Sequence, residues 1–547
     1  MAFYGIPTPG LALTASTAGD TIQLFNNSTA VISANTIIGL NGNDIINLGA
    51  EGYTASQVAF ISGIAGGTGS LATGVSGTYY LSGTLLGQDA IYQTGTSVTY
   101  SGLGPNGFSG SVTVAGVITS ENAVRRIVAS QIYGNQDNDS IALGTELGIL
   151  SASTIGGGAG NDYIGTYSYV NQQWTSTSIT TASLISNSLI DGGGGNDVIR
   201  LVLPTGSITT ATIQGGAGND SILIDAVAFQ AAQFLGGGDS DVMSGDIHGT
   251  FSGSTIAGGG GNDALVISAS GANATLLAGD VFNVSDSVYD GNDTIQLNFT
   301  TGSSISVQGG GGNDSIVFSA LGGANYIAGN LGNDTIFIQT GFSASTVFGG
   351  AGNDSILLSG SFVGGSLIFG GGDKDTINFA VGDLASGTLF AGTVFGGLGA
   401  DKFQASGTVT GGGTLGVTFG YSAYADSTIS AMDSIAIGTT AASGVYVLDF
   451  VPAGLSLGSF SGSLATGSNG VVTFTSTMDT DVTSRYNVIN ADMTSLGATV
   501  TFKDGAGVNY VFIQGGTSDD LIVQVGQTAS GATISLNGGK LITIDTL

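Results

Sequence analysis

Between Val307 and Leu358, apolar and polar residues alternate with a period of two, and a glycine-rich phrase interrupts the alternation at regular intervals. The phrase reads GGGGNDSI at 309–316, GNLGNDTI at 329–336 and GGAGNDSI at 349–356. Period-two alternation predicts β-strands with one buried face. A phrase that returns every 20 residues predicts stacked units, each a coil of strand, glycine loop, strand and second turn.

Two apolar columns accompany the phrase. One residue of each pair stands two positions before the loop, as Ile155 and Ile327 do, and the other stands two positions after it, as Ile164 and Ile336 do. Stacking brings each column into register and makes continuous apolar ladders inside the coils. The pattern therefore predicts an all-β protein: a parallel β-solenoid, or β-roll, with about 20–23 residues per coil and flanking β-rich regions.

The repeats divide the chain into four regions. Residues 1–50 hold N-terminal strands and a first coil, and 51–130 form a β-rich insertion or small β domain. Residues 131–403 form the solenoid proper, in which the three intervals longer than 23 residues predict loops added outside the core. Residues 404–547 form a β-rich assembly region with a final coil near 512–523.

The glycine loop has six positions, Gly-Gly-x-Gly-Asn-Asp, and each residue type has a physical reason to be there. Glycines allow positive φ and let main-chain carbonyls turn toward one point. The sixth-position aspartate adds a hard anionic oxygen, and two neighbouring loops together offer the oxygen-only coordination that Ca²⁺ accepts. Without a cation, the aspartates would form a column of like charges one strand spacing apart. A cation-free solenoid is the alternative, but turn chemistry alone does not require aspartate at one fixed position.

The candidate calcium ligands are the sixth-position aspartates and the first and fourth glycines of the best-preserved loops. Asp137, Asp239 and Asp373 replace the fourth glycine, and Val288 is assigned to the first position of its loop. We expect calcium in most gaps between residues 157 and 375, and least in the loops at 134–139 and 515–520. The aspartates are Asp44, Asp139, Asp162, Asp197, Asp220, Asp241, Asp263, Asp293, Asp314, Asp334, Asp354, Asp375, Asp401 and Asp520. The glycines are Gly157, Gly160, Gly192, Gly195, Gly215, Gly218, Gly258, Gly261, Gly309, Gly312, Gly329, Gly332, Gly349 and Gly352.

Composition narrows the range of partners. The chain has 8 Lys and Arg and a net charge of −30, so it cannot neutralise a row of phosphates and a nucleic-acid partner is not expected. There are no cysteines, which excludes disulfides and thiolate metal sites. Without an apolar run of transmembrane length, membrane insertion is not expected either. Cations are the partners that this charge favours.

The phrases GGAGNDYI at 157–164, GGGGNDVI at 192–199 and GGGGNDSI at 309–316 resemble the nonapeptide of RTX proteins. Those are parallel β-roll calcium binders exported by type I secretion in Gram-negative bacteria. Standard RTX rolls have 18-residue coils with calcium on both edges, whereas one phrase per 20–23 residues implies calcium on one edge and a free Ser/Thr-rich edge opposite. This version looks most like the calcium-binding S-layer proteins of Gram-negative bacteria.

The resemblance implies an extracellular, cell-surface protein with a carboxy-terminal secretion signal. The first cationic side chain is Arg125, so we expect no cleaved amino-terminal signal peptide. Our hypothesis is a secreted structural protein that extracellular calcium folds and assembles into a cell-surface layer. Its expected partners are copies of itself, with cell-surface polysaccharide or lipopolysaccharide beside them. The alternative is an RTX adhesin or biofilm-matrix protein that binds glycans or cells.

A secreted hydrolase is a third hypothesis, and the sequence argues against it. Residues 454–458 match the hydrolase elbow G-x-S-x-G, but a triad also requires a histidine. The one histidine, His248, lies within the repeats, and a single histidine cannot form H-E-x-x-H. Ice binding would require a flat ranked array of threonines, yet the third loop position is Gly, Ala, Leu or Asn in this chain. We expect no enzymatic activity.

Overall fold

The computed structural model consists almost entirely of β-strands, with a single α-helix among the residues that it describes. Its internal contacts divide the chain into two compact units, residues 1–270 and 271–547. The described residues are 4–5, 12–14, 21–25, 31–33, 36–40, 43–47, 58–62, 78–82, 91–92, 97–101, 109–113, 126–144, 147–166, 168–170, 173–175, 183–280, 291–359, 362–380, 390–406, 417–437, 444–450, 454–475, 480–516, 520–527, 532–537 and 541–546.

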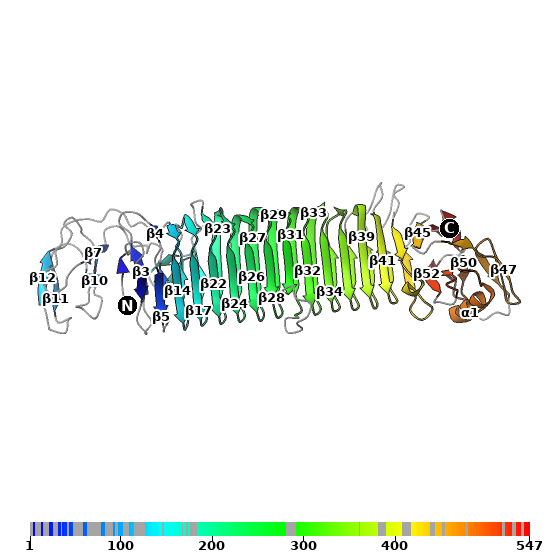
Figure 1. Ribbon diagram of the computed structural model, residues 1–547, viewed down its shortest axis with the longest axis horizontal. Helices are drawn as coiled ribbons and strands as arrows, with labels where there is room; N and C mark the ends of the chain where they lie inside the picture. The colour runs from blue at the N-terminus through cyan, green and yellow to red at the C-terminus, as the bar shows by residue number, and fades with distance from the viewer. Residues whose placement is uncertain are drawn as a thin grey trace. The chain divides into compact units, whose positions relative to one another are not determined.

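In the first unit, strands on either side of each glycine loop stack into two parallel sheets, and each strand pairs with its equivalent one coil away (Figure 1). The sheet that precedes the loops contains β2 (Ala12–Thr14), β5 (Thr36–Leu40), β14 (Gln131–Gln136), β17 (Thr154–Ala159), β22 (Leu189–Gly194), β24 (Thr212–Ala217), β26 (Gln233–Gly238) and β28 (Thr255–Gly259). The sheet that follows the loops contains β1 (Tyr4–Gly5), β3 (Thr21–Phe25), β6 (Ile45–Asn47), β15 (Ser140–Ala142), β18 (Tyr163–Gly165), β23 (Val198–Thr209), β25 (Ser221–Gln230) and β27 (Val242–Ser252).

Short strands extend the second sheet toward the second turn in the early coils. They are β4 (Val31–Ser33), β13 (Arg126–Val128), β16 (Ile149–Ser151) and β21 (Leu184–Ser186). In β23, β25 and β27 one long strand covers both stretches, with a shift of register in β23 between Leu203 and Ser207. The strand β29 (Ala264–Asn273) begins in the first unit and ends in the second.

The second unit repeats the arrangement. Before the loops lie β30 (Leu276–Asp280), β32 (Ser306–Gly311), β34 (Tyr326–Leu331), β37 (Thr346–Ala351), β39 (Phe362–Gly372), β41 (Phe390–Leu398) and β43 (Thr418–Tyr421). After them lie β31 (Thr294–Ser303), β33 (Ser315–Gly323), β35 (Thr335–Ile338), β38 (Ser355–Leu358), β40 (Thr376–Ala380), β42 (Lys402–Ser406) and β44 (Asp433–Ile437), with the two-residue strand β36 (Phe342–Ser343) at the second turn. The predicted parallel β-solenoid is therefore confirmed.

The interior of each unit is made of the predicted apolar columns. Ile132 pairs with Ile155 in one sheet, and Ile141 pairs with Ile164 in the other, so identical side chains stack from coil to coil. All four side chains are fully buried. Residues between them alternate outward, which is why the strands are apolar on one face only.

The second turn uses a left-handed residue, and in several coils a buried serine follows it. Ala152 has a φ of 50° and Ala324 a φ of 56°, a conformation that side chains rarely adopt. Ser153, which follows Ala152, is 3% exposed, and its Oγ accepts the main-chain N–H of Ser130 one coil earlier. The expectation of a free Ser/Thr edge is wrong for such serines, because their hydroxyls are turned inward to bond between coils.

The end of the chain departs from the coil pattern. In the second unit, β45 (Gly444–Phe450) still pairs in parallel with β43, but β54 (Leu541–Thr546) pairs with β45 in the antiparallel direction. The remaining strands of this region are β46 (Ser456–Leu457), β47 (Phe460–Ser461), β48 (Ala465–Ser468), β49 (Val471–Phe474), β50 (Ala498–Lys503), β51 (Val508–Ile513), β52 (Leu521–Gln527) and β53 (Ala532–Asn537).

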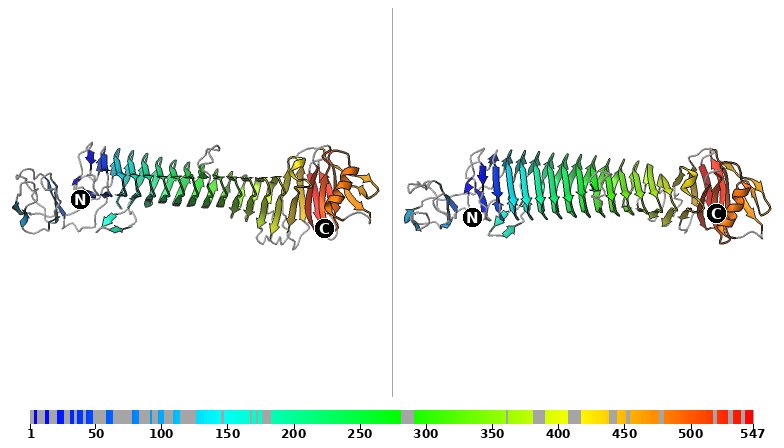
Figure 2. Two further views of the ribbon diagram at one scale, coloured as in Figure 1. Left: turned by 90° about the horizontal axis from the view of Figure 1, so that it is seen from below. Right: turned by 60° about the horizontal axis from the view of Figure 1, so that its bottom comes forward.

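The predicted final coil near 512–523 is wrong. Strands β51 and β52 pair in the antiparallel direction, so residues 508–527 form a hairpin rather than a strand–loop–strand coil. Helix α1 (Val482–Asp492) buries Ile489 in a cluster with Val500 and Phe512, and the orange helix can be followed beside the red strands in Figure 2. Among the described residues, no helix has the length and apolar character to cross a membrane.

Residues 51–130 contain strands, as the composition suggested. Strands β7 (Val58–Ser62), β9 (Thr78–Ser82) and β10 (Ile91–Tyr92) form one small sheet, and β11 (Ser97–Ser101) pairs with β12 (Ser109–Thr113) as a hairpin. A further hairpin, β19 (Ser168–Val170) with β20 (Gln173–Thr175), lies in the longest interval between loops. The boundaries of the four predicted regions stay predictions.

Candidate metal site

The sixth-position aspartates of the glycine loops come together as a continuous row inside each unit. After the first member in each unit, Oδ1 accepts the main-chain N–H of the aspartate one coil earlier; Asp139 donates to Asp162 at 2.7 Å and Asp334 donates to Asp354 at 2.8 Å. At most 3% of any row member is exposed. The row contains Asp44, Asp139, Asp162, Asp197, Asp220, Asp241 and Asp263 in the first unit, and Asp293, Asp314, Asp334, Asp354, Asp375, Asp401 and Asp433 in the second.

Asp433 is a member of this row that sequence reasoning missed. Its Oδ1 accepts the N–H of Asp401 at 2.9 Å, just as Oδ1 of Asp401 accepts the N–H of Asp375 one coil earlier. No glycine loop precedes it, which hid it from a search for the complete phrase. The signal that could have found it is the ending Asp-Ser-Ile at 433–435, which also closes the loops at 314–316 and 354–356.

Asp520, which was predicted as a ligand, lies outside the row. Its Oδ1 accepts the N–H of Gly515 at 2.8 Å, and its Oδ2 accepts the hydroxyl of Tyr486 at 2.9 Å. The phrase at 515–520 resembles a glycine loop in letters, but it connects two antiparallel strands and has no following coil to face.

The fifth-position asparagines form a second row with the opposite direction. The Oδ1 of Asn161 accepts the N–H of Asn196 one coil later at 2.7 Å, and the Oδ1 of Asn333 accepts the N–H of Asn353 at 2.7 Å. Ser240 takes the same place, and its Oγ accepts the N–H of Asn262 at 3.0 Å. This row is exposed, neutral and satisfied by the chain itself.

The glycines of the loop are required by space as well as by conformation. Gly158 and Gly160 have φ values of 117° and 132°, in the left-handed region. Asp239 and Asp373, which replace the fourth glycine as predicted, have φ values of 69° and 71° there. Gly157 differs: a Cβ on it would lie 2.3 Å from Asp162 Oδ2 and 2.4 Å from the carbonyl oxygen of Gly192 in the next coil.

At the first position, two oxygens of other residues therefore lie in the space that a side chain would fill. The same pair, the carboxylate Oδ2 of its own coil and the first-position carbonyl of the next, faces Gly309, Gly349 and Gly370 within 2.6 Å of the Cβ position. Carbonyl oxygens of the second and fourth positions also point from coil to coil, since those of Gly158 and Gly160 approach Gly193 and Gly195.

The loop that ends at Asp293 begins earlier than predicted. A Cβ on Gly279 would lie 1.9 Å from Asp293 Oδ2 and 2.4 Å from the carbonyl oxygen of Gly309, so Gly279 takes the first position. The assignment of Val288 to that position is wrong. The extra residues are inserted inside the loop, between Asp280 and Gly291, rather than before it.

The second carboxylate oxygen defines the chemistry of the row. It is buried, and in several row aspartates of each unit it has no hydrogen-bond partner among the described residues. This holds for Oδ2 of Asp139, Asp162, Asp197, Asp220, Asp241, Asp314, Asp334, Asp354, Asp375 and Asp401. A buried carboxylate oxygen without a donor is costly, so each of these atoms calls for a proton or a cation.

Burial raises the pKa of these carboxyl groups far above the ordinary value. The pKa rises to about 6 for Asp162 and Asp334, to about 7 for Asp354, and to about 8 for Asp314 and Asp375. Desolvation is the largest cause, and for Asp314, Asp354 and Asp375 the charges of neighbouring aspartates raise the pKa further. The N–H bond from the preceding coil lowers each pKa by a smaller amount.

The donor set fits a hard divalent cation. Within the described part of the chain, no three Asp, Glu, His or Cys side chains cluster to hold a metal, so a site here has one carboxylate per coil and main-chain carbonyls for the rest. Oxygen-only sets of this kind suit Ca²⁺, which takes 6–8 oxygens in flexible geometry, better than Mg²⁺, which demands a near-ideal octahedron.

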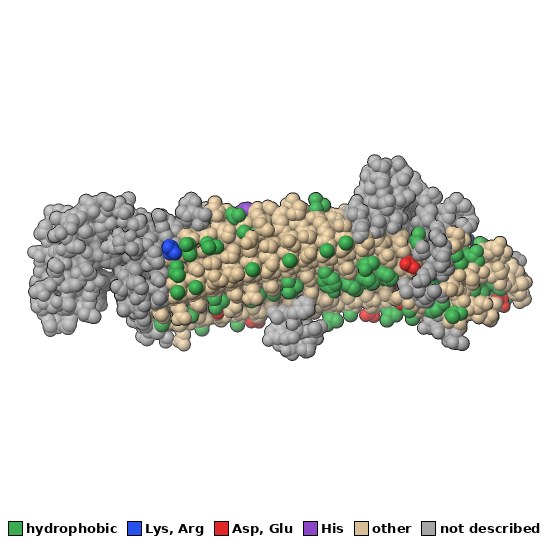
Figure 3. Space-filling view, turned by 45° about the horizontal axis from the view of Figure 1, so that its top comes forward, with side chains coloured by type: hydrophobic (Ala, Val, Ile, Leu, Met, Phe, Trp, Pro, Cys, Tyr) green, Lys and Arg blue, Asp and Glu red, His purple; other side chains and the backbone are tan. Residues whose placement is uncertain are grey.

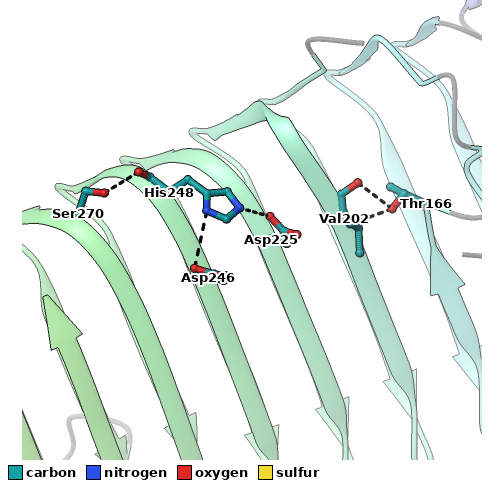
Figure 4. A network of polar contacts seen from close by, with 6 residues as sticks. All are labelled: Thr166, Val202, Asp225, Asp246, His248 and Ser270. Atoms are coloured by element: carbon teal, nitrogen blue, oxygen red, sulfur yellow. Dashed lines mark hydrogen bonds and ion pairs between the residues drawn. The ribbon is translucent and has the colours of Figure 1, made fainter. Parts of the chain in front are cut away.

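The one histidine is held in a separate polar contact on the surface (Figure 4). His248 Nε2 lies 2.9 Å from Asp225 Oδ1, and Nδ1 lies 4.0 Å from Asp246 Oδ1. The hydroxyl of Ser270 donates to the main-chain oxygen of His248 and not to its ring. The contact pairs a histidine with acids and supplies no serine nucleophile.

No known protein family and no curated protein matches the chain. A solved structure that does match is the X-ray crystal structure of a hyperactive, Ca²⁺-dependent, β-helical antifreeze protein from an Antarctic bacterium. It is 20% identical, with a TM-score of 0.34 over 54% of this chain and 84% of that one. A likeness at this score carries no argument about what this chain binds.

Proposed function

We propose that the protein is a calcium-binding structural protein whose solenoid is stabilised by a row of Ca²⁺ ions along the glycine-loop edge. The observation that carries the proposal is the buried Oδ2 of row aspartates in both units, such as Asp162 and Asp354, which has no donor within the described structure. The residues that would hold an ion are the aspartate of one coil and the first-position glycine of the next, for example Asp354 and Gly370. Bound calcium would supply the positive charge that the row lacks.

Aspartate at the sixth position favours a cation over a mere turn. An asparagine there could keep its Oδ1 bond, and its amide could donate to the glycine carbonyl that faces Oδ2, so a cation-free turn has no need of an acid. The chain places asparagine at the fifth position and aspartate at the sixth in nine loops whose fourth residue is glycine. A protonated carboxyl group could donate the same hydrogen bond as an amide. Calcium titration distinguishes a protonated row from a calcium-bound row.

We propose further that the protein is secreted and that calcium drives its assembly into a cell-surface layer. The RTX-like loops and the absence of cysteine support export to a calcium-rich exterior. On the face seen in Figure 3, coloured charged side chains are few although the chain carries a net charge of −30, which suits close contact between copies. Exposed polysaccharide or lipopolysaccharide on the cell is the proposed anchor.

Coupled folding is the proposed mechanism of assembly. At low calcium the acidic chain repels itself and the row aspartates resist burial, so the folded state is less stable than it is with calcium. Calcium outside the cell binds the folded coils and not the unfolded chain, and this shifts the equilibrium toward folding by mass action.

The first experiment follows folding by far-UV circular dichroism while calcium is added to EGTA-treated protein, with magnesium as the control cation. We expect β signal and melting temperature to rise with calcium and much less with magnesium. A chain that is fully folded in EGTA, and whose melting temperature calcium leaves unchanged, contradicts the calcium proposal.

The second experiment is negative-stain microscopy of purified monomer before and after calcium. Ordered sheets support the layer. Dispersed, folded particles at saturating calcium contradict it, and glycan-array binding by those particles supports the adhesin alternative instead.

A further inference from the structure

The column of first-position glycines in the second unit ends at an aromatic residue. Strands β41 and β43 pair with Phe395 opposite Gly420, which places Tyr421 in the position after Gly396 in the stack. The next residue in the column is Phe450, which pairs with Tyr421. Tyr421 is 1% exposed and Phe450 is fully buried.

Tyr421 fills the space that holds oxygens in the earlier coils. At Gly370, the Cβ position lies 2.3 Å from Asp375 Oδ2 and 2.6 Å from the carbonyl oxygen of Gly396. One coil after Gly396, the column holds Tyr421 instead of a glycine, so a buried side chain stands where the earlier coils have only a hydrogen atom. No glycine loop follows to offer carbonyls, because Phe450 occupies the next position of the column.

The hydrogen bonds of the aspartate row stop at the same coil. Asp433 accepts the N–H of Asp401, but its own N–H goes to the hydroxyl of Ser427 at 2.9 Å rather than to another aspartate. That hydroxyl donates in turn to the main-chain oxygen of Ile522 in β52. Strand β52 pairs in parallel with β44 and belongs to the terminal hairpin, so the terminal region replaces the next coil.

We infer that Tyr421 closes the row of cation sites: its side chain fills the space that the first-position glycine leaves to oxygens in the earlier coils, and the coil formed by residues 418–437 binds no calcium. The inference rests on the proposed calcium row. A cation at this level would face one carboxylate and an apolar ring instead of a following set of carbonyls, which is too few oxygens for Ca²⁺. The buried ring also separates the last occupied gap from the terminal region.

Calcium stoichiometry tests the inference. Full-length wild type, Asp433→Asn and the matched Asp354→Asn are saturated with calcium, freed of unbound ion, and analysed for bound calcium by plasma mass spectrometry. We expect Asp433→Asn to bind as much calcium as wild type and Asp354→Asn to bind less. Loss of calcium from Asp433→Asn equal to the loss from Asp354→Asn overturns the inference. Wild type without bound calcium overturns the proposed function instead, which is a different result.

Discussion

An asparagine and an aspartate stand side by side in most of the glycine loops, and their side chains bond in opposite directions. The asparagine accepts an N–H from the coil that follows, whereas the aspartate accepts one from the coil that precedes. The asparagine is exposed, and its Oδ1 accepts a hydrogen bond from the chain. The aspartate has a second, buried oxygen, Oδ2, that no group donates to, as in Asp334 and Asp354. At the scale of single residues, the aspartate is the position at which the fold calls for a proton or a cation.

Asp354→Asn is predicted to stabilise the calcium-free protein and to weaken its response to calcium. The amide removes a buried acid whose pKa is raised to about 7, and its N–H can donate to the facing glycine carbonyl. We expect a gain of about 1–3 kcal/mol in EGTA, measured by urea unfolding with and without calcium. Asn353→Ser is the control, because Ser240 already serves in that row. A less stable variant with an undiminished calcium response contradicts the prediction.

Gly370→Ala is predicted to destabilise the protein strongly, and Gly372→Ala in the same loop is its control. A Cβ on Gly370 meets Asp375 Oδ2 at 2.3 Å and a carbonyl oxygen at 2.6 Å, whereas a Cβ on Gly372 meets nothing within 4 Å. Forcing atoms into that space costs about 1–3 kcal/mol, which urea unfolding in calcium measures. Equal effects of the two substitutions would show that the first position holds no crowded oxygens.

At the scale of the element, stacking turns single acids into a coupled row. The folded pKa values of about 6 to 8 lie well above the unfolded value near 3.8. Between these values the calcium-free native state binds protons that the unfolded chain does not, so its stability is present at low pH and is lost as pH rises.

In EGTA, the free energy of unfolding is therefore predicted to fall as pH rises from 5 to 8. In saturating calcium the fall should be reduced or reversed, because the ion replaces the protons on the same oxygens. Chemical unfolding at a series of pH values measures both curves. A calcium-free protein that grows more stable over this pH range would contradict the raised pKa values.

The elements that repeat could be predicted, and those that do not repeat could not. Strict alternation around Ile155 and Ile164 identifies the two sheets, because each strand has only one buried face. The loop at Gly279 was misplaced because an insertion inside a loop leaves the same spacing as an insertion before it. Asp433 was missed, and the hairpin at 508–527 was mistaken for a coil, because pairing direction is decided by distant strands and not by a local phrase.

At the scale of the whole molecule, the proposed calcium row would make stability a sum over coils and the ions between them. The protein is predicted to melt at a temperature that climbs steadily with free calcium, since each tenfold increase above the dissociation constant of a site stabilises the folded protein by about 1.4 kcal/mol for that site. Scanning calorimetry over a calcium series measures this slope. Asp433→Asn should reproduce the wild-type slope, while a melting temperature independent of calcium would rule out a structural role for the ion.

The left-handed alanines of the second turn affect the stability of the protein without calcium. Ala324 and Ala344 hold a conformation that suits glycine, and Gly365 shows that the position accepts it. Replacing such alanines by glycine should relieve strain throughout the stack and strengthen the fold equally with or without calcium. A chain improved in this way would stay folded even with its proposed sites empty, so the strained turns keep the empty protein closer to unfolding and leave room for calcium to control folding.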